Sequence, residues 1–506
     1  MSAQRDDRID DGAEVVVIGG GSGGAVVAGR LAEAGVSVVL VEAGPDYGHI
    51  DEGRWPAEIL GADLIATTHD WGYTSGPVAG RDEPWTWERA RILGGCSAHN
   101  GAIAAVGHHR DYDAWKLPGW DTATLRPLFV TALERMRVRT YTRAEAGPFH
   151  DRCLDAAVSA GWPVDTTTFA SDLCDLDAGD NFGLEPVNVF EGIRWNTAFA
   201  YLDPVRATGK LRIVDHTVVD RITGGDGGRP VTVHAVRHGR PLTIGADRVV
   251  LAAGVYGTPA ILQRSGIGPA DALRTLGIEP TLDLPAVGAN LHDHPMINAS
   301  RALGPDLQQW MDEAAAAGFV PEEQTLGKAR SSLATDGIYD LHVFPVCSST
   351  QTQLTKGRAL MEVACVNPRS RGTVLVAGPD PEAHPRIDHG YLNDPEGHDW
   401  RVLRDGLELA EEFLAQPALR AVLIDEPPTD RSEGAIRRQV LHYYHPVGTA
   451  AMGLDPAASV CDPAGRVHGR SGLVVADASL FPTIPRANTN IPAVVVGERI
   501  AQLLLA

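Results

Sequence analysis

The clearest pattern of apolar and polar positions lies near the start of the chain. Residues 13–20, AEVVVIGG, form a continuous apolar run, which is typical of a strand buried on both faces of a parallel sheet. Residues 25–35, AVVAGRLAEAG, then read as a helix that stops at Gly35. Residues 36–44, VSVVLVEAG, form a second apolar run. The order strand, helix, strand predicts one unit of a parallel sheet.

Later parts of the chain predict further elements of this sheet. Residues 248–268, RVVLAAGVYGTPAILQRSGIG, read as a buried strand, a glycine turn and a helix that ends at Gly266. Residues 472–482, GLVVADASLFP, predict a buried strand followed by Asp477, at the carboxyl edge where ligands bind. The last helix, 491–506, has Pro492 near its first turn and therefore presents free amides.

A glycine pattern joins the first strand to the first helix. Gly19, Gly21 and Gly24 have the GxGxxG spacing, and Glu42 ends the next strand 18 residues after Gly24. Glycines allow a tight turn and a close approach to a pyrophosphate, which binds at the N-terminus of the helix. The carboxylate can accept the two ribose hydroxyls. The pattern predicts a dinucleotide site and leaves nicotinamide and flavin dinucleotides open.

Composition and charge narrow the class of protein. The 506 residues carry 65 acidic and 44 basic side chains, a formal charge of −21, which argues against nucleic acids and anionic membranes as partners. The charge serves either solubility or the attraction of a cationic substrate. No apolar run approaches the ~20 residues of a membrane span, and the acidic start, MSAQRDDRIDDGAE, does not read as a signal peptide. The six cysteines lack CxxC spacing, which favours free thiols and a cytoplasmic location.

Five further stretches occur in a fixed order: 89–101 (RARILGGCSAHNG), 254–269 (GVYGTPAILQRSGIGP), 287–295 (VGANLHDHP), 444–453 (YHPVGTAAMG) and 474–501 (VVADASLFPTIPRANTNIPAVVVGERIA). Together they resemble the glucose–methanol–choline (GMC) oxidoreductases, flavoenzymes that oxidise alcohols, and the motif around residue 99 is nearest to choline oxidase-like members. Ala90 stands where a glycine is usual in the family, and Val255 where a small residue is usual. Three alternatives stay open: a nicotinamide dehydrogenase, an FAD-holding lyase and a non-catalytic flavin-binding protein.

The fold class that follows is α/β: a Rossmann-like FAD-binding domain with a second, α+β substrate domain built on an antiparallel sheet. Residues 371–378 and 385–392 suit an open sheet in the second domain, residues 398–420 have helical periodicity, and residues 311–324 suggest a short helix and a loop near the substrate side. The apolar side of the long helix would carry Leu403, Leu407, Ala410 and Leu414. We expect the FAD-binding domain at 13–159, 195–297 and 433–506, and the substrate domain at 160–194 and 298–432.

The resemblance implies FAD as the cofactor and assigns contacts to it. In the family the GGxS loop runs along the flavin, and in choline oxidase-like members a histidine at the position of His99 is bonded covalently to FAD. His99 is therefore expected to form this bond, against the alternative of a buried, hydrogen-bonded histidine. The expected cofactor contacts are Gly19, Gly21, Ser22, Gly24, Glu42, Gly95, His99, Asn100, Gly101, Val219, Asp477, Asn488 and Thr489.

The resemblance also places the catalytic groups. His445 stands at the position of the family's active-site histidine and would take the hydroxyl proton, while Asn488 would orient the hydroxyl and stabilise the alkoxide. His342 resembles an additional active-site histidine of choline oxidase-like members. His292, His294 and His442 are interpreted as structural, and we expect no metal ligands.

The expected substrate is a small alcohol, with hydride passing to the flavin and with O2 or an unknown acceptor taking the electrons. Before His342 we find no acid that clearly matches the one expected to bind a trimethylammonium group, and the stretch LGKARSSLATDG carries Lys328 and Arg330 instead. Six acids of the same variable region favour an amino alcohol or an aminoglycoside-like polyol, and a neutral primary alcohol remains the alternative. These acids are Asp306, Asp312, Glu313, Glu322, Glu323 and Asp336. The sequence leaves the oligomeric state open.

Overall fold

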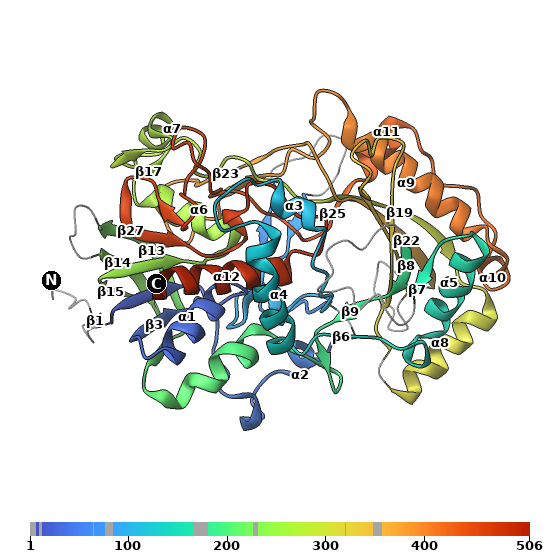
Figure 1. Ribbon diagram of the computed structural model, residues 1–506, viewed down its shortest axis with the longest axis horizontal. Coiled ribbons are helices and arrows are strands. Elements are labelled where there is room, and N and C mark those ends of the chain that lie inside the picture. Colours follow the sequence, from blue (N-terminus) through green and yellow to red (C-terminus); the bar gives the residue numbers. More distant parts are fainter. Residues whose placement is uncertain are drawn as a thin grey trace.

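Two large sheets lie at opposite ends of the molecule (Figure 1). The computed structural model describes residues 7–9, 13–63, 65–75, 84–165, 181–225, 231–318, 320–347 and 357–506. The first sheet has the strand order β12-β3-β2-β16-β27-β26 and is parallel except for its last pair. Its strands are β2 (Val15–Ile18), β3 (Val38–Val41), β12 (Leu211–Val214), β16 (Arg248–Leu251), β26 (Arg466–Val467) and β27 (Arg470–Val475).

The central strands of this sheet are buried along their whole length, as their continuous apolar runs predict. Helix α1 (Gly24–Glu33) follows β2, and Gly35 takes a positive φ of 87° just beyond the end of the helix. That conformation favours glycine, so the predicted stop at this residue is confirmed. The predicted second unit is also confirmed, because β16 pairs in parallel with β2 and leads into α6 (Gly254–Arg264).

Close backbone contacts explain the glycines around α1. A side chain at Gly24 would overlap the carbonyl oxygen of Gly19, and one at Gly23 would overlap the carbonyl oxygen of Ala476. The C-terminal helix α12 (Asn490–Leu505) lies beside α1 (Figure 1), and a Cβ at Gly497 would lie 2.6 Å from the carbonyl oxygen of Gly23. Gly497 therefore allows the two helices to approach each other closely at this point.

A four-stranded sheet, in the order β1-β15-β14-β13, adds to the same core. Its long strands β13, β14 and β15 pair antiparallel, and their buried alternate residues join those of the parallel sheet. The strands are β1 (Asp7–Ile9), β13 (Thr217–Gly224), β14 (Val231–Arg237) and β15 (Arg240–Ala246).

The second large sheet has the order β25-β19-β22-β21-β20-β8-β7 and is antiparallel apart from the β7–β8 pair. The predicted fold class, a parallel cofactor sheet with a second domain on an antiparallel sheet, is confirmed. The strands are β7 (Val164–Asp165), β8 (Asn181–Leu184), β19 (Pro295–Ala302), β20 (Thr325–Ala329), β21 (Leu341–Val346), β22 (Arg358–Cys365) and β25 (Leu441–His442).

Alternation along β21 gives the two faces of this sheet different roles. Leu341 and Val343 pack into the core beneath helix α9 (His398–Leu414), whereas His342 and Phe344 point to the opposite face. The helix buries the predicted apolar side, including Leu407. The face opposite α9 is therefore the one available for chemistry.

Packing departs from the expected arrangement in three places. Residues 371–378 and 385–392 do contain strands, β23 (Thr373–Leu375) and β24 (Arg386–Asp388), but these pair with each other outside the large sheet, so that expectation is wrong. Gln263 of α6 holds them through hydrogen bonds to Val374 and Val376. Helix α5 (Pro148–Ser159) packs into the core of the second sheet, and β25 completes that sheet's edge, although both lie in segments assigned to the FAD-binding domain.

The region 311–324 lies at the end of helix α8 (Pro305–Ala317) and in the segment that leads to β20, as expected of a helix followed by a loop.

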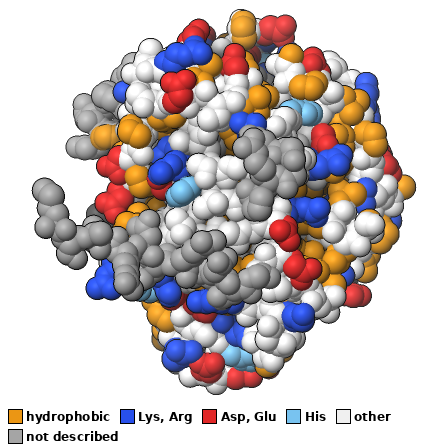
Figure 2. Space-filling view, turned by 90° about the vertical axis from the view of Figure 1, so that its left-hand side faces the viewer, with side chains coloured by type: hydrophobic (Ala, Val, Ile, Leu, Met, Phe, Trp, Pro, Cys, Tyr) orange, Lys and Arg blue, Asp and Glu red, His pale blue; other side chains and the backbone are white. Residues whose placement is uncertain are grey.

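The five cysteines among the described residues are free thiols, while Cys174 lies outside the described residues. Within the described part of the chain, no helix is both long and apolar enough to cross a membrane. On the face of Figure 2, acidic and basic side chains are interspersed among the coloured residues.

Candidate active site

The glycine-rich turn after β2 and the loop 92–101 meet at the carboxyl edge of the parallel sheet. The amide of Gly94 donates to the carbonyl of Gly20 at 2.8 Å, and a Cβ built on Gly95 would lie 2.6 Å from the Cα of Gly21. Gly94 and Gly95 have positive φ values of 95° and 52°. Side chains at these positions would separate the two loops, so the glycines keep two backbones together where a dinucleotide is expected.

Glu42 lies at the end of β3 beside this turn. Its carboxylate accepts the amides of Gly20 and Gly44, each at 2.8 Å, and it is 6% exposed. Burial raises the pKa of Glu42, while these amides act in the opposite direction. Each carboxylate oxygen retains a further lone pair. The acid is thus fixed in the position that the dinucleotide pattern requires.

The start of α12 reaches the same turn. Ser22 donates its hydroxyl to the side-chain oxygen of Asn490 at 2.8 Å, and Thr489 is the buried residue before the helix. The N-terminal amides of α12 therefore begin beside the glycine turn, as the predicted anion site requires.

Asp477 and Val219 occupy structural positions at this edge. Asp477 accepts the amide of Gly254 at 2.9 Å and the hydroxyl of Thr258 at 2.6 Å, so it joins β27 to the start of α6. Val219 is buried in β13, and its carbonyl accepts from Arg264 at 3.3 Å. Both residues lie in the elements of the cofactor lobe where they were expected.

His99 follows a short helical turn, Gly95–Ala98, within the loop 92–101. Its Nε2 lies 3.0 Å from the carbonyl oxygen of Thr68, which can only accept, so Nε2 carries the proton and Nδ1 keeps the lone pair. Burial lowers the pKa of His99 to about 4, and the imidazole is neutral at neutral pH. Asn100 accepts the amide of Ala102 at 3.0 Å and supports the end of the loop, next to Gly101.

His445 and His294 form a buried pair whose Nδ1 atoms are 3.0 Å apart. The carboxylate of Asp293 accepts the backbone amides of both residues, at 2.9 Å from His445 and 2.8 Å from His294. Tyr391 donates its hydroxyl to the other oxygen of Asp293 at 2.8 Å. Burial raises the pKa of Asp293 to about 6 despite these bonds. One carboxylate therefore positions two segments that are 151 residues apart.

Asn488, Tyr443 and His342 gather around His445. The Tyr443 ring centre lies 4.2 Å from that of His445 and 6.2 Å from that of His342. The side chains of Tyr443 and Asn488 contact each other, and both ring nitrogens of His342 have no hydrogen-bond partner among the described residues. All three side chains are buried. The predicted catalytic residues are thus brought together, with polar atoms left over for another molecule.

The histidines of the site are neutral imidazoles at neutral pH. Burial is the largest factor that holds the pKa of His445 well below its usual value. Repulsion between a protonated His445 and the neighbouring His294 and His342 lowers this pKa further. Burial lowers the pKa of His294 to about 3 and that of His342 well below 6.5. A neutral imidazole can accept a proton, whereas an imidazolium cannot.

Other predicted residues have simpler surroundings. His292 accepts the amide of Ile484 at 2.9 Å, consistent with the structural role predicted for it. Asp336 forms an ion pair with Arg486 at 2.6 Å. Three of the acids in the variable region, Asp306, Asp312 and Glu313, are exposed on α8.

Sequence reasoning missed four kinds of residue here. His294 was interpreted as structural, yet its ring contacts His445, and the supporting Asp293 and Tyr443 were not singled out. Asp293 and His294 both lie in the family stretch VGANLHDHP, and this membership is the sequence signal that could have marked them as active-site residues. Glu185 and Glu362, described below, had no sequence signal because they come from separate strands.

The comparisons with known proteins agree with this geometry. Residues 13–296 and 368–497 match the two family models described as GMC oxidoreductase. The chain belongs to this family, and it is an FAD-dependent oxidoreductase that binds FAD. The glycine cradle, the buried Glu42 and the amides of α12 fit that cofactor.

Individual relatives cover nearly the whole chain. Choline oxidase from Arthrobacter globiformis is 31% identical over 97% of this chain and 94% of its own length. Oxygen-dependent choline dehydrogenase from Paraburkholderia xenovorans (strain LB400) is 32% identical over 96% and 93%. The crystal structure of pyridoxine 4-oxidase from Mesorbium loti is similar with a TM-score of 0.82 and 25% identity, covering 97% of this chain and 98% of that one.

Proposed function

We propose that the protein oxidises an alcohol, in particular a primary alcohol of a polar substrate, to the aldehyde. The observation that carries this proposal is the buried group of His445, Asn488 and His342, each of which contacts or lies near the Tyr443 side chain. When bound, FAD supplies the hydride acceptor at flavin N5. The names of the relatives, which act on choline and pyridoxine, support an alcohol substrate.

His445 takes the hydroxyl proton in this proposal. A base at Nε2 requires that the Nδ1–H of His445 donates in the 3.0 Å contact to Nδ1 of His294. His294 is then a positioning residue, because its lone pair fixes the tautomer and the ring orientation of His445. The Asn488 amide donates to the substrate oxygen, where negative charge develops as the proton leaves.

Molecular oxygen is the acceptor that the relatives' names favour, since they include an oxidase and an oxygen-dependent dehydrogenase.

We also propose that FAD is bonded covalently through His99. The neutral ring and the lone pair on Nδ1 support a nucleophilic role for this residue. Acid denaturation should then leave yellow colour in the pellet, and His99→Asn should release its FAD. Complete release of FAD from the parent protein would rule out the covalent bond.

The function is tested by mixing the holoenzyme anaerobically with a panel of alcohols and recording the absorbance of the oxidised flavin near 450 nm. Primary alcohols should bleach this band, and aldehyde should form in equal amount. If no neutral, cationic or anionic alcohol bleaches the flavin, the proposal fails. A lyase that holds FAD without oxidising its substrate then becomes the better explanation.

A further inference from the structure

Four glutamates converge on the substrate-facing side of the second sheet, and we call them the glutamate cluster. They come from three places in the chain: the end of β8, the segment before β20 and the middle of β22. The members are Glu185, Glu322, Glu323 and Glu362. Only two of them lie in the variable acidic region that the sequence indicated.

The cluster extends from the loop 92–101 toward His445. A Cβ built on Gly101 would lie 3.9 Å from a carboxylate oxygen of Glu323. At the other side, Glu362 is paired with Phe344 in the register of β21 and β22, so both point to the same face. The Phe344 ring stacks on that of Tyr443 at 4.7 Å, and Tyr443 contacts His445.

The carboxylates of the cluster have few partners apart from one another. Glu185 is fully buried, and the carboxyl group in contact with it is that of Glu323, so the pair must share a proton or bind a cation. The Asn298 side chain bonds to Glu362, but one oxygen of Glu362 and one of Glu323 have no hydrogen-bond donor among the described residues. The nearby Tyr443 hydroxyl is buried beside the Asn488 side chain. Buried polar atoms are rarely left unpaired, so these positions indicate a ligand.

Among the described residues, no basic side chain compensates the charge of three of these acids. In the described chain, no lysine or arginine is among the groups that shift the pKa of Glu185, Glu322 or Glu362. Burial raises the pKa of Glu185 and Glu362 to about 8 and that of Glu322 to about 7. Burial and the neighbouring negative charges raise the pKa of Glu323 further. Lys328, on the same sheet face, lies over the ring of Tyr339.

We propose that the alcohol substrate carries at least two ammonium groups, which the glutamate cluster binds while the hydroxyl reaches His445. This inference rests on the proposed alcohol oxidation and names its substrate class. A single cation bound by the Glu185–Glu323 pair would leave Glu362 without one. Two ammonium groups separated by a short carbon chain can donate to Glu185 and Glu323 at one side and to Glu362 at the other.

The first experiment compares kcat/KM for 2,3-diaminopropan-1-ol, 2-aminopropan-1-ol and propan-1-ol with the parent holoenzyme. The diamine should be preferred over the monoamine by at least about tenfold, and the monoamine over the neutral alcohol, because each ammonium adds a buried ion pair. Equal values, or a preference for propan-1-ol, would overturn the proposal.

The second experiment locates the preference. Glu185→Gln and Glu362→Gln should each lower the ratio of kcat/KM for the diamine to that for the neutral alcohol by at least about tenfold. Glu313→Gln is the matched control, since it removes the same charge from the exposed side of α8 and should leave the ratio unchanged. Equal ratios in the cluster variants and the control would place the selectivity elsewhere and overturn the proposal.

Calorimetric titration of the holoenzyme with 1,3-diaminopropane separates this inference from the proposed function, because the probe has no hydroxyl to oxidise. Binding that Glu185→Gln weakens and Glu313→Gln does not supports the cluster, even if no alcohol bleaches the flavin. If neutral alcohols bleach the flavin and the diamine does not bind, the cluster proposal fails and alcohol oxidation stands.

Discussion

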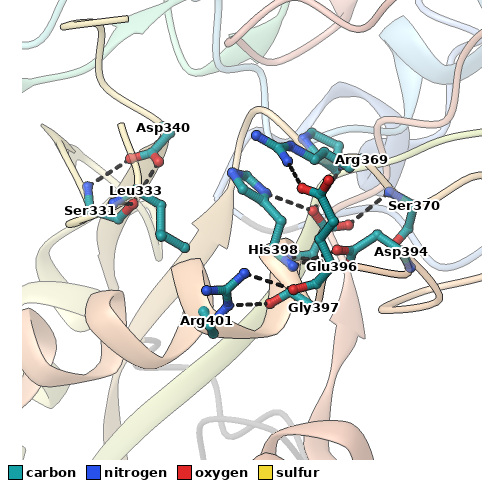
Figure 3. A network of polar contacts seen from close by, with 12 residues as sticks. Ser331, Leu333, Asp340, Arg369, Ser370, Asp394, Glu396, Gly397, His398 and Arg401 are labelled. Carbon is teal, nitrogen blue, oxygen red and sulfur yellow. Dashed lines mark hydrogen bonds and ion pairs between the residues drawn. The ribbon is translucent and has the colours of Figure 1, made fainter. Parts of the chain in front are cut away.

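Two buried groups of carboxylates in this protein have opposite surroundings. At the start of α9, the oxygens of Asp399 accept the amides of Arg369 and Ser370, each at 2.9 Å, and the side chain of Asp394 accepts the amide of His398. Figure 3 shows this network of dashed contacts around His398. In the glutamate cluster, by contrast, Glu185 accepts no backbone amide among the described residues and contacts another acid, Glu323.

The difference indicates what each group is for. Although burial alone would raise it, the hydrogen bonds from His398, Ser370 and Arg369 hold the pKa of Asp399 below its usual value. Cys365, His398 and Asp399 bring potential metal ligands within 4.8 Å of one another, but both Asp399 oxygens already join the helix start to a loop. The α9 network joins the helix start to a loop, whereas the proposed active site has polar atoms without a partner among the described residues.

Replacing His445 should have the largest effect. His445→Ala should keep its FAD and its stability but reduce the flavin at least about 100-fold more slowly, the usual scale for loss of a general base. Stopped-flow absorbance under anaerobic conditions measures the rate. Reduction at the parent rate would remove His445 from the mechanism.

A change in the α9 network should act on stability instead. Asp399→Ala leaves the buried amide of Ser370 and the partly buried amide of Arg369 unpaired, which should lower the free energy of unfolding by about 2–4 kcal/mol. Denaturant unfolding measures it. Asp312→Ala, at an exposed acid of α8, is the control and should change stability by less than about 0.5 kcal/mol. Equal losses in the two variants would contradict the structural role.

Glu185→Gln should change stability in the opposite direction. The substitution removes a buried carboxylate that the described protein does not compensate, so unfolding at pH 8 without substrate should require about 1 kcal/mol more. The same denaturant measurement applies. A loss as large as that of Asp399→Ala would mean that Glu185 already has a structural partner.

The two groups should also respond to pH with opposite signs, which is the smallest effect. The pKa of Glu185 and Glu362 is raised from 4.5 to about 8, so the folded state binds their protons more tightly than the unfolded state does. Their contribution to the free energy of unfolding is therefore complete below pH 4.5 and is lost as pH rises through about 8. The contribution of Asp399, with its lowered pKa, is present above 3.8 and is lost at more acidic pH.

Substrate-free protein should therefore become less stable between pH 5 and pH 8.5, measured by denaturant unfolding at each pH. In the Glu185→Gln, Glu362→Gln double variant this slope should be reduced. An unchanged slope would assign the pH dependence to other groups.

The sequence predicted much of the cofactor lobe and little of the substrate site. Continuous apolar runs and glycine spacing are local, so β2, α1 and β3 could be placed from the residues themselves. The strands β23 and β24 were predicted as elements, but their pairing was not, because pairing depends on the partner strand. His294 was undervalued for a similar reason: its contact with His445 joins two distant segments.

By itself the sequence determined the dinucleotide turn and the order of the family motifs, since these depend on neighbours in the chain. Only the tertiary structure decided that Glu185, Glu323 and Glu362 face the same space and that no cation among the described residues accompanies them. A sequence lists the charges, but the burial and pairing of each charge depend on which strands fold together. The solvation and partners of a carboxylate, rather than its presence, decide whether it stabilises a helix or binds a substrate.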